Sequence, residues 1–296
     1  MSDANPRQFG PEELAEVFRA LERIASPCVL IGGQAVNYWA RRFLAEEPAL
    51  QKMEAVAPFL SKDVDFLGSR DATIQLAHAI GCQADLPGFR QSFGNLLSGK
   101  FTMTIGSGHL KVEVLRKVPG LSETETQRLA TVEKVSQHSI RILNPVGMLL
   151  AKTWNVVNIS EAGRHDAEQL LVLLPCVRAY LKMFLKLGAS TPTSLRAALN
   201  LVEHALGFIE KKAGLQAAQR CGLDWRQILP HAYLAAATEP ALARLRTRRL
   251  PLWLAKISGY QRGVPDNPTL VRLLDILACH AETPGGVSKK AGPGRA

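Results

Sequence analysis

The chain lacks several features that would place it in a familiar class of protein. No apolar run approaches the roughly 18 to 20 uncharged residues that span a bilayer. Residues 1–10 are polar and do not resemble a secretory signal. We therefore expect no membrane partner and a cytoplasmic location. The five cysteines lie far apart without a CxxC pair, which argues against a zinc ribbon or a dithiol redox site and predicts reduced thiols in the core.

The composition is that of a folded protein with an excess of positive charge. With 296 residues, 47% of them hydrophobic, the chain can build one to three domains. The formal net charge of +10 favours polyanionic partners such as nucleic acid or nucleotides. The arginines in 244–249 and the basic residues of the C-terminal tail supply much of this excess. A merely solvated surface would account for them equally well.

The hydrophobic pattern changes near residue 145. Residues 10–145 alternate between helical and strand-like periodicity, whereas the later residues are almost wholly helical. This pattern predicts an α/β (α+β) protein in which a sheet with flanking helices precedes a helical half. We divide the chain into residues 1–144, a helical C-terminal domain at 145–281 and a disordered basic tail at 282–296. Pro175 is expected to interrupt the helix that follows Arg164.

Two short segments combine acidic residues with strand periodicity. Asp63 and Asp65 alternate with Val64 and Phe66, so both carboxylates should point to the same side of one strand. Glu113 stands between two valines in a second strand-like segment and should emerge opposite the core. If these strands are neighbours, three carboxylates share one surface. Hard cations prefer such oxygen ligands, so the pattern predicts a site for Mg²⁺ or Mn²⁺.

A pair of glycines precedes the acidic residues. Gly32 and Gly33 lie between a short apolar run and a helical segment. Glycines let the backbone approach a phosphate closely, and the helix N-terminus offers unpaired N–H groups to an anion. No Gly-Lys-Ser/Thr follows, so the turn is not a Walker motif.

The order strand, Gly-Gly, helix, Asp-x-Asp strand and third acid resembles the nucleotidyltransferase superfamily. Within it, the chain is similar to the AbiEii/AbiGii toxin-like branch, whose members often act as toxins of bacterial toxin–antitoxin or phage-defence pairs. The resemblance covers roughly residues 10–175 and is carried by the segments 30–35, 61–66, 112–115, 144–152 and 164–166.

The resemblance implies a nucleotidyltransferase-fold mixed sheet and a set of roles. Gly32 and Gly33 would cradle the nucleotide phosphates. Asp63 and Asp65 would ligate metal, and Glu113 would bind a second metal or accept the proton of the nucleophile. By the same resemblance Lys152 would be a triphosphate contact and Asp166 an uncertain fourth site. Lys111 shares a strand face with Glu113, which makes it a candidate for a phosphate contact or a surface ion pair.

The chain departs from the family pattern in two places. Many members have serine where this chain has Gly33, so a hydroxyl contact to phosphate would be missing. The 29 residues between Gly33 and Asp63 also form a longer interval than many members show, and residues 42–58 within it look helical.

Three functions are compatible with these residues. The first is a metal-dependent transfer of a nucleoside monophosphate from an NTP to a hydroxyl, with release of pyrophosphate. RNA or a tRNA end, a protein side chain and a small molecule such as an antibiotic are candidate acceptors, and a cognate antitoxin is a candidate partner. The second is a catalytically degenerate binding module. The third, a metal-dependent nuclease, is disfavoured because no lysine stands two residues after Glu113. The oligomeric state is not predicted.

Overall fold

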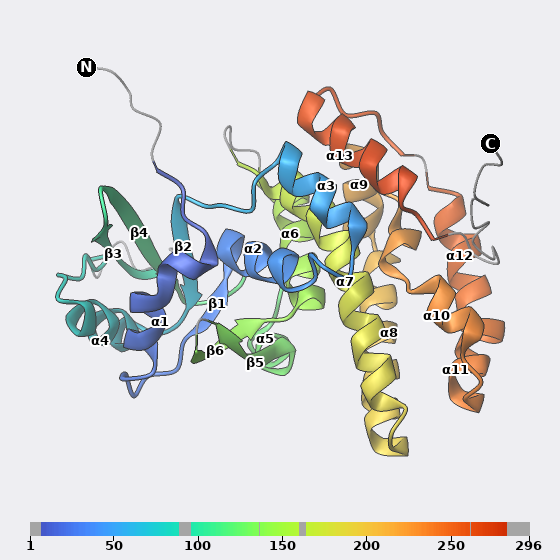
Figure 1. Cartoon of the computed structure of the whole chain (residues 1–296), viewed down its shortest axis with the longest axis horizontal. Helices are drawn as coiled ribbons and strands as arrows, with labels where there is room; N and C mark the ends of the chain where they lie inside the picture. Colours follow the sequence, from blue (N-terminus) through green and yellow to red (C-terminus); the bar gives the residue numbers. More distant parts are fainter. Residues whose placement is uncertain (1–6, 89–95, 136, 160–163, 261, 283–296) are drawn as a thin grey trace, which may run out of the picture.

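The computed structural model describes residues 7–88, 96–135, 137–159, 164–260 and 262–282. Figure 1 shows a sheet with its helices at one end of the molecule and a group of helices at the other. The elements of the sheet-containing part are η1 (Pro11–Leu14), α1 (Ala15–Leu21), β1 (Val29–Ile31), α2 (Gly32–Arg42), α3 (Pro48–Val56), β2 (Asp63–Leu67), α4 (Arg70–Ile80), β3 (Leu97–Ile105), β4 (Gly108–Leu115), α5 (Glu123–Leu129), β5 (Ala130–Val135) and β6 (His138–Leu143).

The rest of the described chain is helical. Its elements are α6 (Pro145–Asn158), α7 (Asp166–Gly188), α8 (Pro192–Ile209), α9 (Lys212–Cys221), η3 (Trp225–Ile228), α10 (His231–Ala236), α11 (Pro240–Arg244), the π-helical turn η4 (Leu245–Arg249), α12 (Leu250–Ser258) and α13 (Pro268–Cys279). The predicted fold class, a mixed sheet with flanking helices followed by a helical half, is confirmed.

The sheet has six strands in the order β3-β4-β2-β1-β6-β5. The pairs β2–β4 and β1–β6 are parallel, and the other pairs are antiparallel. The residues of β2 and β4 that alternate with the acids are fully buried, namely Val64, Phe66, Val112 and Val114. Helix α4 packs on β3 and β4, and α1 packs on α4 and β6. This arrangement leaves the acidic residues on the face opposite the core, as the two-residue periodicity predicts.

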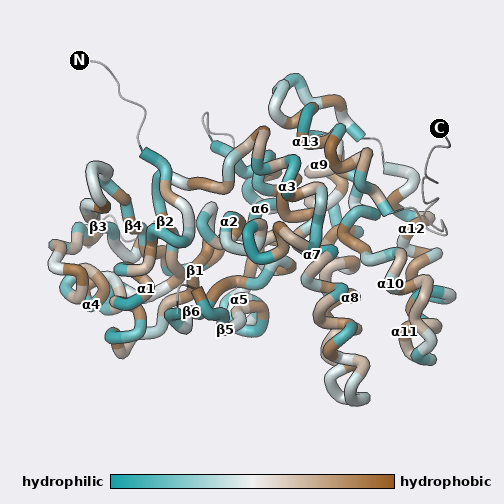
Figure 2. The backbone as a smooth tube through the Cα atoms, viewed as in Figure 1, coloured by the Kyte–Doolittle hydropathy of each residue, from teal (hydrophilic) through white to brown (hydrophobic). Residues whose placement is uncertain are grey.

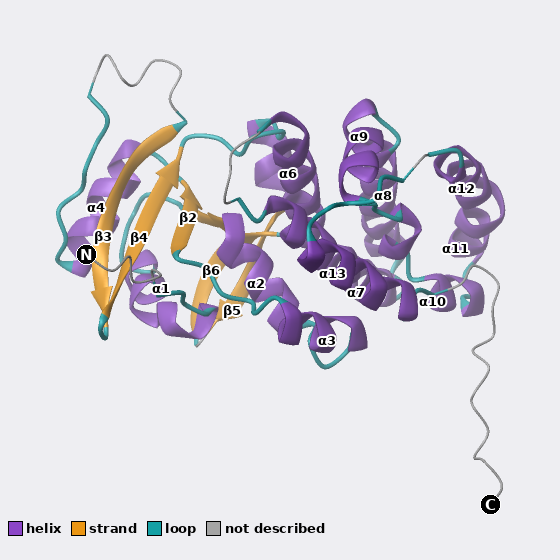
Figure 3. Ribbon diagram, turned by 90° about the horizontal axis from the view of Figure 1, so that it is seen from above, coloured by secondary structure: helices purple, strands orange, loops and turns teal. Residues whose placement is uncertain are grey.

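Helix α2 connects the sheet to the helical half. It contacts β1 and β2 on one side and α6 and α7 on the other, and Figure 3 shows it between the two parts. The buried side chains of both parts belong to one continuous hydrophobic core, and hydrophobic stretches run through both in Figure 2. The division at residue 144 stays a prediction. Of the predicted tail, only Glu282 lies within the described residues.

The expectation that Pro175 interrupts its helix is wrong. Helix α7 runs from Asp166 to Gly188 with Pro175 inside it, and every residue from 170 to 181 is buried. A proline inside a helix costs about 3 kcal/mol, because it removes one hydrogen bond and crowds the preceding turn. Burying one large apolar side chain contributes about 1.5–3 kcal/mol. The several leucines and valines of α7 therefore outweigh the proline.

The cysteines follow the sequence-based expectation in part, and Cys82 is only half-buried. All five are free thiols, and Cys28, Cys176 and Cys221 are buried. Burial raises the pKa of Cys28 to about 12, which makes it an inert core thiol. Cys279, in contrast, is exposed at the end of α13, so it is not a core residue. Among the described residues, none of the helices combines the length and the apolar character needed to cross a bilayer.

Candidate active site

The three predicted acids lie on two neighbouring strands. Strands β2 and β4 pair in parallel, with Asp63 opposite Lys111 and Asp65 opposite Glu113. Because directly paired residues point to the same side of a sheet, all four side chains share one face. The two strands are neighbours, which is the condition under which the three carboxylates share one surface. Asp63, Asp65 and Glu113 are half-buried, whereas Lys111 is exposed.

The environment of Asp65 disfavours its charge. Burial is the main cause that raises the pKa of Asp65 to about 7, and the negative charge of Asp63 adds to it. Glu113 acts in the same direction, while Lys152 and Lys111 act against it. The ionised carboxylates of Asp63 and Asp65 therefore repel each other, and a cation bound between them would relieve that repulsion.

The glycine turn lies directly against Asp65. Gly32 follows the end of β1 with φ of +68°, a left-handed conformation that favours glycine. A methyl group at Gly32 would lie 2.7 Å from the carboxyl carbon of Asp65. The missing side chain of Gly32 thus makes room for the Asp65 carboxylate.

Gly33 lies close to two polar side chains that sequence analysis did not identify. A methyl group at Gly33 would stand 2.9 Å from Nε2 of Gln169 and 3.1 Å from Oγ of Ser61. The Ser61 hydroxyl donates a hydrogen bond to Oδ1 of Asp63 at 2.9 Å. A hydroxyl therefore stands beside the turn although residue 33 is glycine. The sequence points to these two residues only through their closeness to predicted site residues. Ser61 precedes Asp63 by two residues, and Gln169 follows Asp166 by three on one helix.

Lys152 and Asp166 form a buried ion pair behind the carboxylates. The Lys152 ammonium donates to Oδ1 of Asp166 at 2.7 Å, and both side chains are 8% exposed. Asn155 and Arg164 also donate to the Asp166 carboxylate. Burial alone would raise the pKa of Asp166, but these three donors lower it to about 2. Asp166 is therefore a permanent anion that holds Lys152 in place, and Lys152 in turn stabilises the charged form of Asp65.

Glu113 differs from the two aspartates because it already has a cationic partner. Lys111 Nζ forms an ion pair with Oε1 of Glu113, and this contact raises the pKa of Lys111. Within the ranges that the structure describes, no three or more carboxylate, imidazole or thiol groups are arranged to hold a metal ion together. Asp63 and Asp65 fit a hard divalent cation by their chemistry and mutual repulsion. Glu113 would join the two aspartates as a third metal ligand only if its ion pair with Lys111 were broken.

The arginines of 244–249 are partly engaged inside the protein. Arg249 pairs with Glu203 and Glu210, and Arg246 donates to two backbone carbonyls. Arg244 and Arg248 are exposed. Two of the four arginines therefore make contacts within the protein, and the two exposed ones are the candidates for contact with a phosphate backbone.

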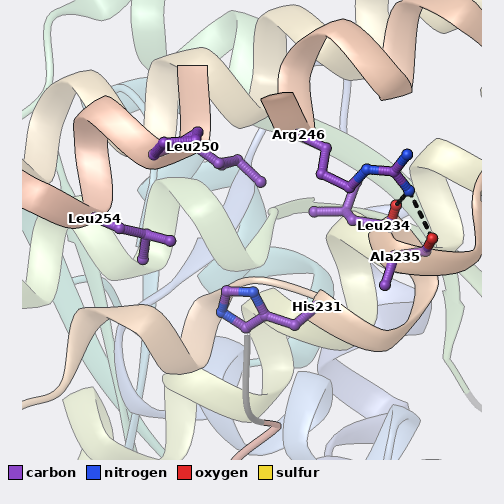
Figure 4. Close-up of a pocket in the computed structure, with 7 residues that line it drawn as sticks. His231, Leu234, Ala235, Arg246, Leu250 and Leu254 are labelled. Atoms are coloured by element: carbon purple, nitrogen blue, oxygen red, sulfur yellow. Dashed lines mark hydrogen bonds between the residues drawn. The ribbon is translucent and has the colours of Figure 1, made fainter. Parts of the chain in front are cut away.

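A separate cavity of about 240 Å³ is lined by residues of α10, η4 and α12 (Figure 4). Figure 1 shows α10 and α12 at the opposite end of the molecule from β2 and β4. Nη1 of Arg246, at its edge, donates to the carbonyls of Leu234 at 3.1 Å and Ala235 at 2.6 Å. Burial lowers the pKa of His231, another lining residue. The remaining lining is apolar, formed by Leu234, Ala235, Leu250, Pro251 and Leu254. None of the predicted site residues reaches this cavity.

No family model and no curated protein matches the chain. Among solved structures, the fold is similar to that of an antigenic nucleotidyltransferase-like protein from Paracoccidioides brasiliensis. The two chains are 12% identical, and the match covers 67% of this chain and 90% of the other with a TM-score of 0.38. A likeness at this level supports no assignment of residues, so the candidate site rests on the geometry described above.

Gly32→Ala tests the contact between the turn and Asp65. We expect a loss of roughly 1–2 kcal/mol in unfolding free energy from the left-handed backbone alone, with further loss because Asp65 must move. Gly207→Ala in α8 is the control, since its methyl group would meet no atom within 4 Å. It should stabilise the helix by about 0.5–1 kcal/mol. Chemical denaturation measures both, and equal stability of the two variants would contradict the proposed close approach.

The pKa of Asp65 predicts a pH-dependent stability in the absence of metal. Its carboxyl group ionises near 3.8 when unfolded and near 7 when folded. The neutral form therefore contributes stability that is fully present below about pH 4 and is lost as the pH rises toward 7. Relative to Asp65→Asn, the metal-free wild type should lose unfolding free energy over this interval and remain level above it. Denaturation in the presence of a chelator at several pH values measures the difference. A wild type that gains stability relative to Asp65→Asn as the pH rises, or that shows no change relative to it, would contradict the assigned burial.

Proposed function

We propose that the protein is a metal-dependent nucleotidyltransferase that moves a nucleoside monophosphate from an NTP to a hydroxyl acceptor. The observation that carries the proposal is the parallel pairing of β2 and β4, which places Asp63, Asp65 and Glu113 on one face beside the Gly32–Gly33 turn. Carboxylates, a glycine turn at a helix N-terminus and a buried lysine are the groups that a triphosphate and its cation require.

The proposed transfer exchanges a phosphoanhydride bond for a phosphodiester bond. The acceptor hydroxyl oxygen forms a bond to the α-phosphorus, and the bond from that phosphorus to the bridging oxygen of the β-phosphate breaks. Pyrophosphate leaves with the electron pair. Glu113, which pairs with Asp65 across the two strands, would take the hydroxyl proton in one version of the proposal. In the other version Glu113 would join the aspartates as a metal ligand, and the hydroxyl proton would pass to solvent water.

The protein groups would bind and orient the reactants. Asp63 and Asp65 would hold Mg²⁺ or Mn²⁺, which supplies charge neutralisation for the phosphates when bound. The free N–H groups at the start of α2 and the Lys152 ammonium offer positive potential to the triphosphate. The Ser61 hydroxyl and the Gln169 amide, both next to Gly33, add neutral hydrogen-bonding groups.

We further propose RNA, and a tRNA end in particular, as the acceptor. The support is the net charge of +10, the exposed Arg244 and Arg248, and the sequence resemblance to the toxin-like branch. A role as the toxin of a toxin–antitoxin or phage-defence pair, held in check by a cognate antitoxin, belongs to the same proposal. Growth arrest on expression of the wild type, absent with an Asp65 variant, is the corresponding cellular test.

A specific observation favours a second candidate function. The ion pair between Lys111 and Glu113 removes one carboxylate from the metal-ligand set, as expected for a degenerate module that binds no metal. Incubation with each radiolabelled NTP, Mg²⁺ and total cellular RNA separates the two candidates. Label transfer by the wild type and none by Asp65→Asn supports the enzyme. Absence of both transfer and Mg²⁺–NTP binding in the wild type supports the module.

A further inference from the structure

The pairing of β2 with β4 places a lysine among the three carboxylates. Lys111 stands directly opposite Asp63 in the register and precedes Glu113 by two residues on the same strand face. Its ammonium group pairs with Glu113, and its charge also acts on Asp63 and Asp65. Lys111 is therefore the one cation of β2 and β4 that faces all three acids among the described residues.

The charges at this face decide how many divalent ions are needed. Three ionised carboxylates carry three negative charges, and the Lys111 ammonium reduces the sum to two. A single divalent cation neutralises that remainder. Without the lysine, the charge of Glu113 is left uncompensated at this face, and Glu113 can instead ligate a second divalent ion.

The other nearby cations do not replace Lys111. Lys152 acts on Asp65, but its ammonium is held in an ion pair with Asp166 and not with Glu113. Lys100 of β3 stands opposite Glu113 in the register, but its ammonium lies 3.5 Å from Oδ2 of Asp85. The cation that balances Glu113 therefore comes from Lys111 alone among these lysines.

We infer that Lys111 takes the place of a second divalent cation, so that the site loads one metal ion, on Asp63 and Asp65, together with its nucleotide. This inference rests on the proposed function and identifies Lys111 as the residue that sets the metal requirement. It also accounts for the ion pair between Lys111 and Glu113.

Counting bound metal in the full-length protein tests the inference without measuring transfer. Mn²⁺ and a non-hydrolysable NTP analogue are added in excess, and bound Mn²⁺ per bound nucleotide is measured by equilibrium dialysis with electron paramagnetic resonance detection. The wild type should bind one Mn²⁺ per nucleotide. Lys111→Met should bind two, with a magnetic coupling between them that the wild type lacks. Lys111→Gln provides an independent variant with the same expected count.

The control variant is Lys100→Met, which removes a lysine from the same sheet face one strand further out. Its count should stay at one. Two Mn²⁺ per nucleotide in the wild type, or one in both Lys111 variants, would overturn the inference and leave the proposed enzyme intact. Nucleotide bound without any Mn²⁺ in the wild type would overturn the proposed metal-dependent function together with the inference.

Discussion

Asp65→Asn should reduce nucleotidyl transfer by at least about a thousandfold. The substitution keeps the size of the side chain but removes the charge that would hold the metal between Asp63 and Asp65. Metal ions contribute several kcal/mol of charge stabilisation to phosphate transfer, and each 1.4 kcal/mol corresponds to about tenfold in rate. Single-turnover transfer of label from the preferred NTP, at saturating Mg²⁺ and nucleotide, measures the loss.

The matched control is Asp275→Asn, which removes an exposed carboxylate from α13, outside the sheet. Its transfer rate should equal that of the wild type. Asp65→Asn should also be no less stable than the wild type without metal, because burial disfavours the charge that it removes. Lost activity then cannot be explained by unfolding. Retention of more than a tenth of the wild-type rate would show that Asp65 does not hold the catalytic metal.

The positions of the acids along the chain could be predicted because strand periodicity is local. Alternation of Asp63 and Asp65 with buried residues fixes the side of the strand to which they point. Which strand lies beside β2, and in which register, depends on contacts that no local pattern encodes. The alignment of Asp65 with Glu113 and of Asp63 with Lys111 therefore had to come from the structure. Lys111 forms with Glu113 the ion pair that was the sequence-based alternative to a phosphate contact.

The position of the glycine turn next to the acids was predicted correctly, but its role was predicted only in part. Sequence analysis assigned Gly32 to phosphate binding, because glycine permits close approach to a ligand. In the structure the group that approaches Gly32 is the carboxylate of Asp65. Gln169 was missed because it comes from the helical half, 136 positions after Gly33 in the sequence. Side chains that reach a site from a distant element leave no spacing pattern for sequence analysis to detect.

The segment between the glycine turn and β2 has a structural role that its length alone did not reveal. It contains α3, as its helical periodicity predicted, and α3 packs on α7 and α13. Glu47 immediately precedes α3, and both its carboxylate oxygens accept from the guanidinium of Arg178 on α7. Nε of Arg178 lies 3.3 Å from Oε1 of Glu47, and both side chains are buried. The inserted residues thus attach the sheet-containing part to the helix that carries Asp166 and Gln169.

Arg178→Met should destabilise the protein by about 3–5 kcal/mol, because it leaves the Glu47 carboxylate buried without a partner. Glu47→Leu should lower the unfolding free energy by a similar amount, because it leaves the Arg178 guanidinium buried without a partner. The double variant should recover most of the loss, since two apolar side chains can replace a buried ion pair with little net change. Denaturant unfolding of the four proteins gives the coupling free energy between the two sites. Additive losses in the double variant would contradict the role of the pair. Because α7 also supplies Asp166 and Gln169 to the candidate site, we expect both single variants to bind Mg²⁺–NTP more weakly than the double variant does.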